Sequence, residues 1–273
     1  MMKEPSWLFK APLAHAISTG EKTETRRVLT PLNTWMDGRP WSLDLLDLDW
    51  EMALVDHGPS PAGNLGPYLR VPHRHLRTWH RVYPRISVGD LIWVREKHFL
   101  LAEDPDPGDE LRYCWVMFPG GLSQLRDMRT GRLCEWDVYE LDDDQRPRWR
   151  PSIYMPRYAS RLTCEVLEVS LQRIQDITTE SIRAEAVHAL PQGDRAVLDE
   201  YRREYGDGLR AMWAAGWDSI NAPRGYGWRK NPWVIAYRFR GYRENIDALL
   251  DLRASGGQDV GKPTEEESNG NHQ

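Results

Sequence analysis

Two long stretches rich in turn-forming residues interrupt this chain and limit the folds open to it. They run from about Pro31 to Pro84 and from about Ala102 to Arg148. Proline, glycine and aspartate recur in both, and neither shows the sustained apolar spacing that a helix requires. We therefore interpret residues 31–84 and 102–148 as loop-rich insertions in a larger domain. Short strands such as Arg112–Phe118 and Cys134–Leu141 are expected to form hairpins in the second insertion.

The remaining sequence carries both strand-like and helix-like patterns. Ser160–Val169 alternates in hydropathy, as a half-buried strand does. A helix is predicted over Thr178–Ala189, with Thr178 or Asp176 as its N-cap. The other expected elements are a helix over Pro12–Thr19 that ends at Gly20, the start of a strand pair over Ile86–Val94, a strand over Pro232–Arg240 and a helical region over Asp194–Trp217. Within Ile86–Val94, a turn at Val88–Asp90 leads into the strand Leu91–Val94. Short strands around helices predict an α+β fold built on a small barrel or curled sheet.

Composition excludes several classes of protein. A hydrophobic share of 40% and a charged share of 28% are typical of a soluble globular chain. No apolar run approaches the roughly 18 residues of a membrane span, and the first ten residues lack the apolar centre of a secretory signal. The three cysteines form no CxxC pair, so we expect reduced thiols in a cytoplasmic protein.

The net charge of −5 is unevenly distributed. Leu101–Pro147 holds 12 acidic residues and 5 arginines, and Ser255–Gln273 holds four acidic residues and one lysine. The latter is almost free of large apolar residues, so 243–273 is interpreted as a helical end followed by a disordered acidic tail. The rest of the chain is mildly basic, which fits a nucleic acid or nucleotide partner but equally fits solvated surface charge.

The first candidate for chemistry is the polar run from Lys22 to Arg27, which follows a predicted helix end. On one regular strand Lys22 and Thr25 would point to opposite faces, so they converge only if Lys22 lies in the turn. A neutral lysine there would activate the Thr25 hydroxyl as a nucleophile. The alternative is a polar edge strand with solvated charges.

Glu185 is the second candidate. In the predicted helix it shares the apolar stripe of Ile182, Ala186 and Ala189. An inward carboxylate is costly unless it is paired or protonated, and such a group suits acid–base catalysis. The alternative is a structural pair with a buried arginine.

A third group of residues would line the rim of a pocket. Arginines there would clamp a carboxylate or phosphate, whereas the alternative is a set of structural Arg–Glu pairs. The residues are Trp93, Arg95, Glu96, Arg157 and Arg161.

A metal centre has little support in the sequence. His73, His75 and His80 are close together but have no evident acidic ligand. The chain lacks the GxGxxG, GxxxxGK[ST], GxSxG and HExxH patterns. We therefore expect no metal and no cofactor. The 13 tryptophans suit either core packing or stacking on bases.

Taken together, several segments resemble the ASCH domain family, whose fold is a PUA-like β-barrel. The resemblance covers most of the chain outside the two insertions and the tail, and it is closest to the longer members found in phage and prophage genomes. It rests on the segments Gly20–Arg27, Gly89–Glu96, Met155–Arg161, Leu171–Glu185, Trp217–Asn221 and Asn231–Val234.

This resemblance implies a single domain over 1–242 with a PUA-like barrel. It also implies a metal-independent amidohydrolase acting on an acylated nucleoside or modified base, such as N4-acetylcytidine. Thr25 would be the nucleophile, Lys22 its base, and Glu185 the proton shuttle to the leaving amine, while Arg26 would bind substrate. One departure is Ala186, which stands where relatives often have glycine.

Two other functions stay open at this point. The chain would be a non-catalytic (or RNA-cleaving) ASCH protein that binds RNA or a modified base through Arg26, Arg95, Arg157 and Arg161. Alternatively it would be a phage accessory protein whose polar cluster only stabilises the barrel. The sequence leaves the oligomeric state open.

Overall fold

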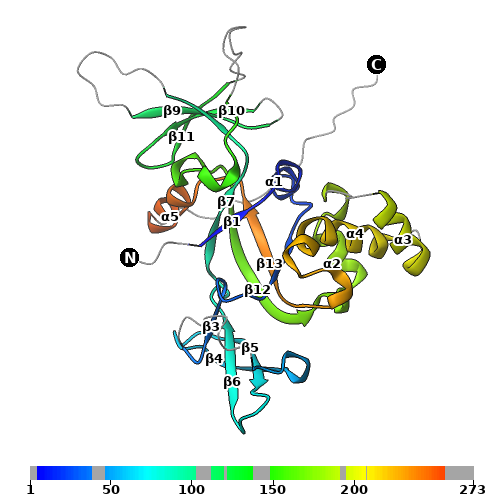
Figure 1. Ribbon diagram of the computed structural model, residues 1–273. Coiled ribbons are helices and arrows are strands. Elements are labelled where there is room, and N and C mark those ends of the chain that lie inside the picture. The colour runs from blue at the N-terminus through cyan, green and yellow to red at the C-terminus, as the bar shows by residue number, and fades with distance from the viewer. Residues whose placement is uncertain are drawn as a thin grey trace, which may run out of the picture.

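The computed structural model describes residues 5–38, 47–102, 112–119, 122–137, 148–190, 195–206 and 208–255. Within them the fold is α+β, as predicted, with three separate sheets (Figure 1). The central sheet has the order β1-β7-β12-β13-β2. Its strands are β1 (Ser6–Leu8), β2 (Glu24–Val28), β7 (Leu91–Arg95), β12 (Thr163–Arg173) and β13 (Trp233–Tyr242).

The long antiparallel pair β12–β13 forms the backbone of the central sheet. A register shift between Val166 and Glu168 interrupts this pairing, and such an irregularity bends a strand. β1 and β2 are the outer strands and do not pair with each other. In the described residues the sheet is therefore curled and open, so the closed barrel expected from the sequence is not formed by hydrogen bonds there.

The described part of the first predicted insertion contains a four-stranded sheet where a loop-rich segment was expected. It has the order β3-β6-β5-β4 and lies at the lower end of the molecule in Figure 1. Leu69, Val71 and Val82 are fully buried and belong to the same hydrophobic core as the central sheet. The strands are β3 (Thr34–Met36), β4 (Leu54–Pro59), β5 (Leu65–Pro72) and β6 (Trp79–Pro84).

The second predicted insertion forms the sheet at the upper end of Figure 1, with the order β11-β10-β9-β8. The strand expected over Arg112–Phe118 is confirmed as β9, and the one expected over Cys134–Leu141 is confirmed as far as β11 extends. The other residues of that prediction lie outside the described residues. The strands are β8 (Phe99–Ala102), β9 (Tyr113–Met117), β10 (Ser123–Asp127) and β11 (Leu133–Asp137).

The helices confirm some predicted boundaries and correct others. Gly20, with φ 79°, follows the first helix as expected. The region 194–217 contains two helices, separated near Gly206 (φ 76°). The helices are α1 (Ala11–Ser18), α2 (Thr179–Ala184), α3 (Arg195–Tyr205), α4 (Leu209–Asn221) and α5 (Ile246–Ala254).

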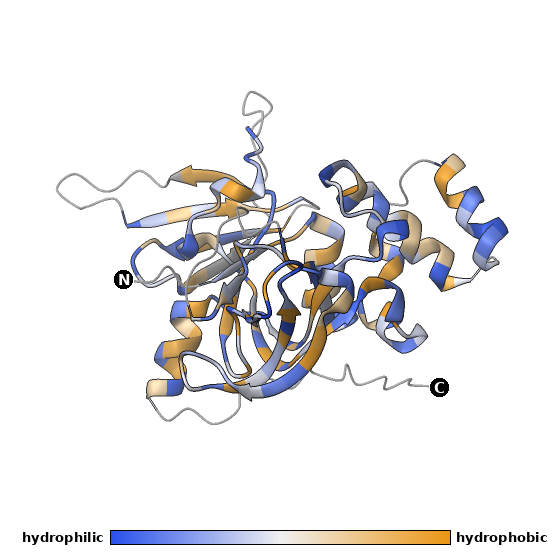
Figure 2. Ribbon diagram, turned by 60° about the horizontal axis from the view of Figure 1, so that its bottom comes forward, coloured by the Kyte–Doolittle hydropathy of each residue, from blue (hydrophilic) through white to orange (hydrophobic). Residues whose placement is uncertain are grey.

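α2, α3 and α4 gather on one side of the central sheet (Figure 1). Figure 2 shows apolar and polar residues interspersed along the sheet strands and blue, hydrophilic segments on α3. α5 confirms the predicted helical end, while the predicted disordered tail lies outside the described residues beyond Ser255. Every helix in the described part of the chain is too short or too polar to cross a membrane.

Candidate active site

A cleft of about 830 Å³ lies between the central sheet, α4 and the segment that precedes the short helix Ser152–Tyr154. This volume falls within the range of small-molecule sites, roughly 300–1,000 Å³. Lys22, Thr25, Arg26 and Glu185, which the sequence analysis selected, all line it. The remaining lining residues that matter for charge and stacking are Lys10, Arg27, Lys97, Trp149, Trp213, Trp217 and Arg224.

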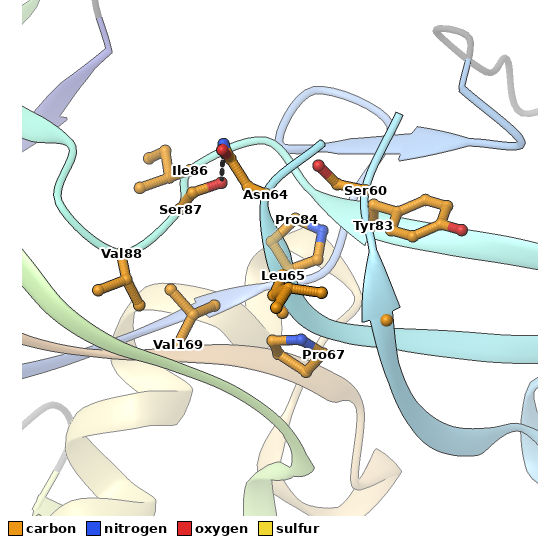
Figure 3. A pocket seen from close by; sticks show the side chains of 12 residues that line it. Ser60, Asn64, Leu65, Pro67, Tyr83, Pro84, Ile86, Ser87, Val88 and Val169 are labelled. Carbon is orange, nitrogen blue, oxygen red and sulfur yellow. Dashed lines mark hydrogen bonds between the residues drawn. The ribbon is translucent and has the colours of Figure 1, made fainter. Parts of the chain in front are cut away.

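A second cavity lies between β5 and β12, where Leu65 and Val169 face each other near Val88 (Figure 3). The Asn64 amide donates a hydrogen bond of 3.2 Å to the Ser87 hydroxyl beside it. The cavity has a volume of about 30 Å³, which is room for only about two water molecules. It is therefore too small for a substrate.

Lys22 is buried in the turn between α1 and β2, the position in which the sequence analysis required it to lie. Its backbone N–H donates to Ala16 O at 2.9 Å, and this hydrogen bond attaches the turn to the last turn of α1. Its Nζ donates to Glu185 Oε2 at 2.6 Å, to Glu24 O at 2.7 Å and to Glu185 O at 3.0 Å. All three ammonium protons therefore have acceptors.

Glu185 accepts from two cations at once. Besides Lys22, Arg26 Nη1 donates to Glu185 Oε1 at 3.1 Å and to Glu24 Oε2 at 3.0 Å. The side chains of Lys22, Arg26 and Glu185 are each at most 3% exposed. The expected inward carboxylate is thus confirmed, and it is paired with a buried arginine as well as with the lysine.

The backbone that carries Glu185 differs from the prediction. The helix predicted to reach Ala189 ends at Ala184, so Glu185 is the C-cap of α2 rather than a member of an apolar helical stripe. Ala186 follows with φ 52° in the left-handed region, and this conformation cannot continue a helix. The turn at Glu185 and Ala186, rather than helical periodicity, orients the Glu185 carboxylate toward Lys22.

Thr25 lies on β2, in register with Tyr237 of β13, and lines the cleft. In the described residues no hydrogen bond joins the Thr25 hydroxyl to Lys22 Nζ. The two residues lie at the same cleft, but the direct nucleophile–base contact suggested by their spacing is not formed in this state. Glu185 is the group that contacts the lysine instead.

Burial shapes the electrostatics of the site. Desolvation lowers the pKa of Lys22 below its ordinary value of 10.5, and attraction to Glu185 opposes that shift. Burial likewise lowers the pKa of the Arg27 guanidinium. The Arg27 guanidinium carbon lies 4.9 Å from the Phe9 ring centre and 5.7 Å from that of Trp7.

The residues predicted to form the rim lie away from the cleft lining. Arg161 forms an ion pair of 2.7 Å with the buried Glu96, and Arg157 forms one of 2.8 Å with Asp247. Arg95 stacks on Trp93, with its guanidinium carbon 4.5 Å from the ring centre. Their geometry matches the structural pairs that the sequence analysis kept as the alternative, and a role in substrate binding stays a prediction.

The histidine group also lacks the geometry of a metal site. His73 Nδ1 already accepts the backbone N–H groups of His75 and Leu76, each at 3.1 Å. His80 Nδ1 lies 2.7 Å from the Asp37 carboxylate. Over the described ranges, no group of three or more histidine, cysteine or acidic residues is arranged to hold a metal ion.

Most of the cleft's cationic and aromatic lining was not predicted from the sequence. Trp213 and Trp217 are four residues apart on α4, and their ring centres lie 6.1 Å apart. That spacing is a readable signal, because residues four apart share one face of a helix. Lys97, Trp149 and Arg224 had no such signal, since only the fold brings their segments to the cleft.

Comparisons of the chain with protein-family models, with curated proteins and with solved structures gave no match. The chemistry of the cleft is therefore inferred from its own residues.

Proposed function

We propose that this chain is a metal-independent amidohydrolase that acts on an acylated nucleoside or modified base, such as N4-acetylcytidine, in the manner of the ASCH family. The observation that carries the proposal is the buried 2.6 Å contact of Lys22 with Glu185, next to Thr25 on the wall of a large cleft. The curled central sheet would then correspond to the PUA-like barrel, and the setting would be the cytoplasm of a phage host.

Protonation of the pair decides whether this chemistry is available. Lys22 as an ammonium cannot act as a base, but a proton passed from Nζ to Glu185 Oε2 leaves a neutral amine and a carboxylic acid. Burial lowers the pKa of Lys22, which favours release of this proton. One proton transfer within the pair therefore produces both the base and the acid that amide hydrolysis requires.

The proposed reaction has two steps, acyl transfer to Thr25 and hydrolysis of the resulting ester. Neutral Lys22 accepts the Thr25 hydroxyl proton as Oγ1 attacks the acyl carbonyl, and Glu185 gives its proton to the departing amine as the C–N bond breaks. Water subsequently cleaves the acyl ester and restores the threonine, releasing a carboxylic acid. The Arg26 guanidinium, which lines the cleft and donates to Glu185 Oε1, is a candidate donor to the carbonyl oxygen.

Turnover of N4-acetylcytidine tests the proposal directly. We expect the wild-type protein to release cytidine, and Lys22→Ala, Thr25→Ala and Glu185→Gln each to lower kcat by about 10²–10⁴-fold. Thr23→Ala is the matched control, because the hydrogen bonds that join Thr23 to Ala184 and Phe239 are made by its backbone. Activity that survives Thr25→Ala would assign attack to water. If the folded wild-type protein showed no turnover, the proposal that it is an amidohydrolase would be rejected.

One observation favours a second function, a non-catalytic protein that binds RNA or a modified base. The three protons of Lys22 are all accepted, and two of the acceptors are backbone carbonyls that also hold the turn in place. A lysine used in this way stabilises the cleft wall rather than reacting. This function predicts ligand binding without turnover and salt-dependent binding of RNA; strand cleavage would mark the RNA-cleaving variant.

A further inference from the structure

The charge of the cleft lining is far from balanced. Six cationic side chains line it, against one carboxylate, Glu185, among the described residues. Glu185 is already shared by Lys22 and Arg26. The cations that no described carboxylate approaches within ion-pair distance are Lys10, Arg27, Lys97 and Arg224.

Hydrogen-bond donors without acceptors are concentrated in the same cleft. Arg26 Nε, Arg27 Nε and Trp213 Nε1 are buried and have no hydrogen-bond partner among the described residues. Most buried donors in folded proteins are paired, since an unpaired one costs free energy. The three residues line the cleft, but these donor atoms are shielded from solvent, so a ligand would reach them only after the side chains move.

Aromatic rings accompany these cations. Trp149 is 38% exposed, and Lys97 Nζ lies 5.6 Å from its ring centre. Trp213 and Trp217 contribute to the cleft wall from α4, but they are only 3% and 4% exposed and belong to the hydrophobic core. The exposed ring of Trp149 beside Lys97 suits a ligand with a planar base and a negative charge close to it.

We infer that the ligand of this cleft is phosphorylated: a nucleotide, or a nucleotide within a strand, rather than a free nucleoside. This inference rests on the proposed function for the base and deepens it by naming the anionic group. Lys97 and Arg224, which are exposed at the cleft, hold the phosphate. A neutral nucleoside would give neither of them an anionic partner.

Equilibrium binding tests the inference without requiring turnover. The probes are cytidine, cytidine 5′-monophosphate and an octacytidylate RNA, each titrated at 50 and 200 mM salt and followed by tryptophan fluorescence. We expect the monophosphate to bind at least about tenfold more tightly than cytidine, because a charge-assisted hydrogen bond is worth more than a neutral one. The log–log slope against salt then separates the two sources of phosphate: about one for a mononucleotide, and several for a strand.

Two variants and a control locate the effect. Lys97→Gln and Arg224→Gln should each remove most of the phosphate advantage while leaving cytidine binding unchanged. Arg238→Gln is the control, since Arg238 pairs with Glu168 at 2.7 Å and does not line the cleft. Equal affinity for cytidine and its monophosphate, or an advantage that survives both variants, would overturn the inference.

Turnover of N4-acetylcytidine and preference for the monophosphate are measured independently of each other. Turnover of N4-acetylcytidine without any preference for the monophosphate would reject only the phosphate site. A phosphate preference lost in Lys97→Gln, in a protein that never releases cytidine, would support the site and reject the amidohydrolase.

Discussion

At the scale of single residues, the centre of the molecule is a buried cluster of two cations and one carboxylate. Lys22 and Arg26 share Glu185, and their side chains are 1% and 2% exposed. Removing such charges from water costs free energy that only close pairing offsets. The cluster therefore contributes little net stability to the fold, and such a cluster suits a role in chemistry or binding.

This view predicts a specific pattern of stability. Glu185→Gln should lower the free energy of unfolding by about 3–5 kcal/mol, because it leaves two buried cations without their anion. The double variant Lys22→Met/Glu185→Gln should recover part of that loss. Denaturant unfolding of Glu185→Gln, Lys22→Met and the double variant measures the coupling. A loss in the double variant equal to the sum of the two single losses would show that the two charges are not coupled.

The exposed pair of Arg238 with Glu168 provides a control for that experiment. Both side chains are more than half exposed, and exposed ion pairs contribute only about 0–1 kcal/mol. Arg238→Gln should therefore leave the unfolding midpoint nearly unchanged.

The lowered pKa of Lys22 predicts the pH dependence of turnover. In the proposed mechanism Lys22 and Glu185 share one proton, so kcat should fall once rising pH removes that proton from the pair, because no acid is then left for the departing amine. Because burial lowers the pKa of Lys22, this descending limb should have its midpoint below 10.5. A pH–rate profile measures the midpoint. A descending limb that persists unchanged in Lys22→Arg would assign the titration to another group.

At the scale of elements, the end of α2 determines where Glu185 points. Thr178 caps the start of the helix by accepting from the Ser181 N–H, and the helix ends after one and a half turns. Ala186 then adopts φ 52°, a conformation that costs a residue with a Cβ about 1–2 kcal/mol. This strain gives a physical reason for the glycine that the sequence resemblance expects at this place.

The strain at Ala186 leads to a matched pair of predictions. Ala186→Gly should leave stability unchanged or raise it by up to about 1 kcal/mol, because relief of the left-handed strain offsets the greater freedom of the unfolded chain. Ala184→Gly, two residues earlier within α2, should cost about 1 kcal/mol. Thermal unfolding measures both changes. Destabilisation of similar size in both variants would contradict the account of strain.

At the scale of the whole molecule, the two inserted sheets are attached differently. The β3–β6 sheet shares the core of the central sheet through Leu69, Val71 and Val82. The β8–β11 sheet instead has a small separate core with the short segment that follows Pro151, made of Val116, Phe118, Met155 and Ala159. Fewer buried apolar contacts should make the second sheet easier to open.

Hydrogen exchange measures this difference. Amides of β9 and β10 should exchange through openings that cost less free energy than those of β5. Val116→Ala and Val71→Ala form a matched pair, because both side chains are fully buried, and each should cost about 1–3 kcal/mol locally. Val116→Ala should reduce protection only in β8–β11, whereas Val71→Ala should lower global stability. Identical exchange behaviour of both sheets would contradict this prediction.

The sequence alone determined the features that depend on nearby residues. Gly20 closes the first helix because a positive φ suits glycine, and the strand that begins at β12 follows from the alternating hydropathy of Ser160–Val169. These interactions act over a few residues, so their signals are visible in a short window. The choice of Lys22, Thr25 and Glu185 as neighbours at one cleft came from the resemblance combined with such local patterns.

Only the tertiary structure decided how distant segments combine. Glu185, the partner of Lys22, is 163 residues away in the sequence. Arg161 was expected to face a substrate but forms an ion pair with Glu96 instead. Lys97, Trp149 and Arg224 reach the cleft only because three separate parts of the chain pack together. The turn-rich stretch 31–84 became a sheet because its strands bury apolar side chains against the central core. Burial and charge pairing are long-range effects, and no local pattern specifies them.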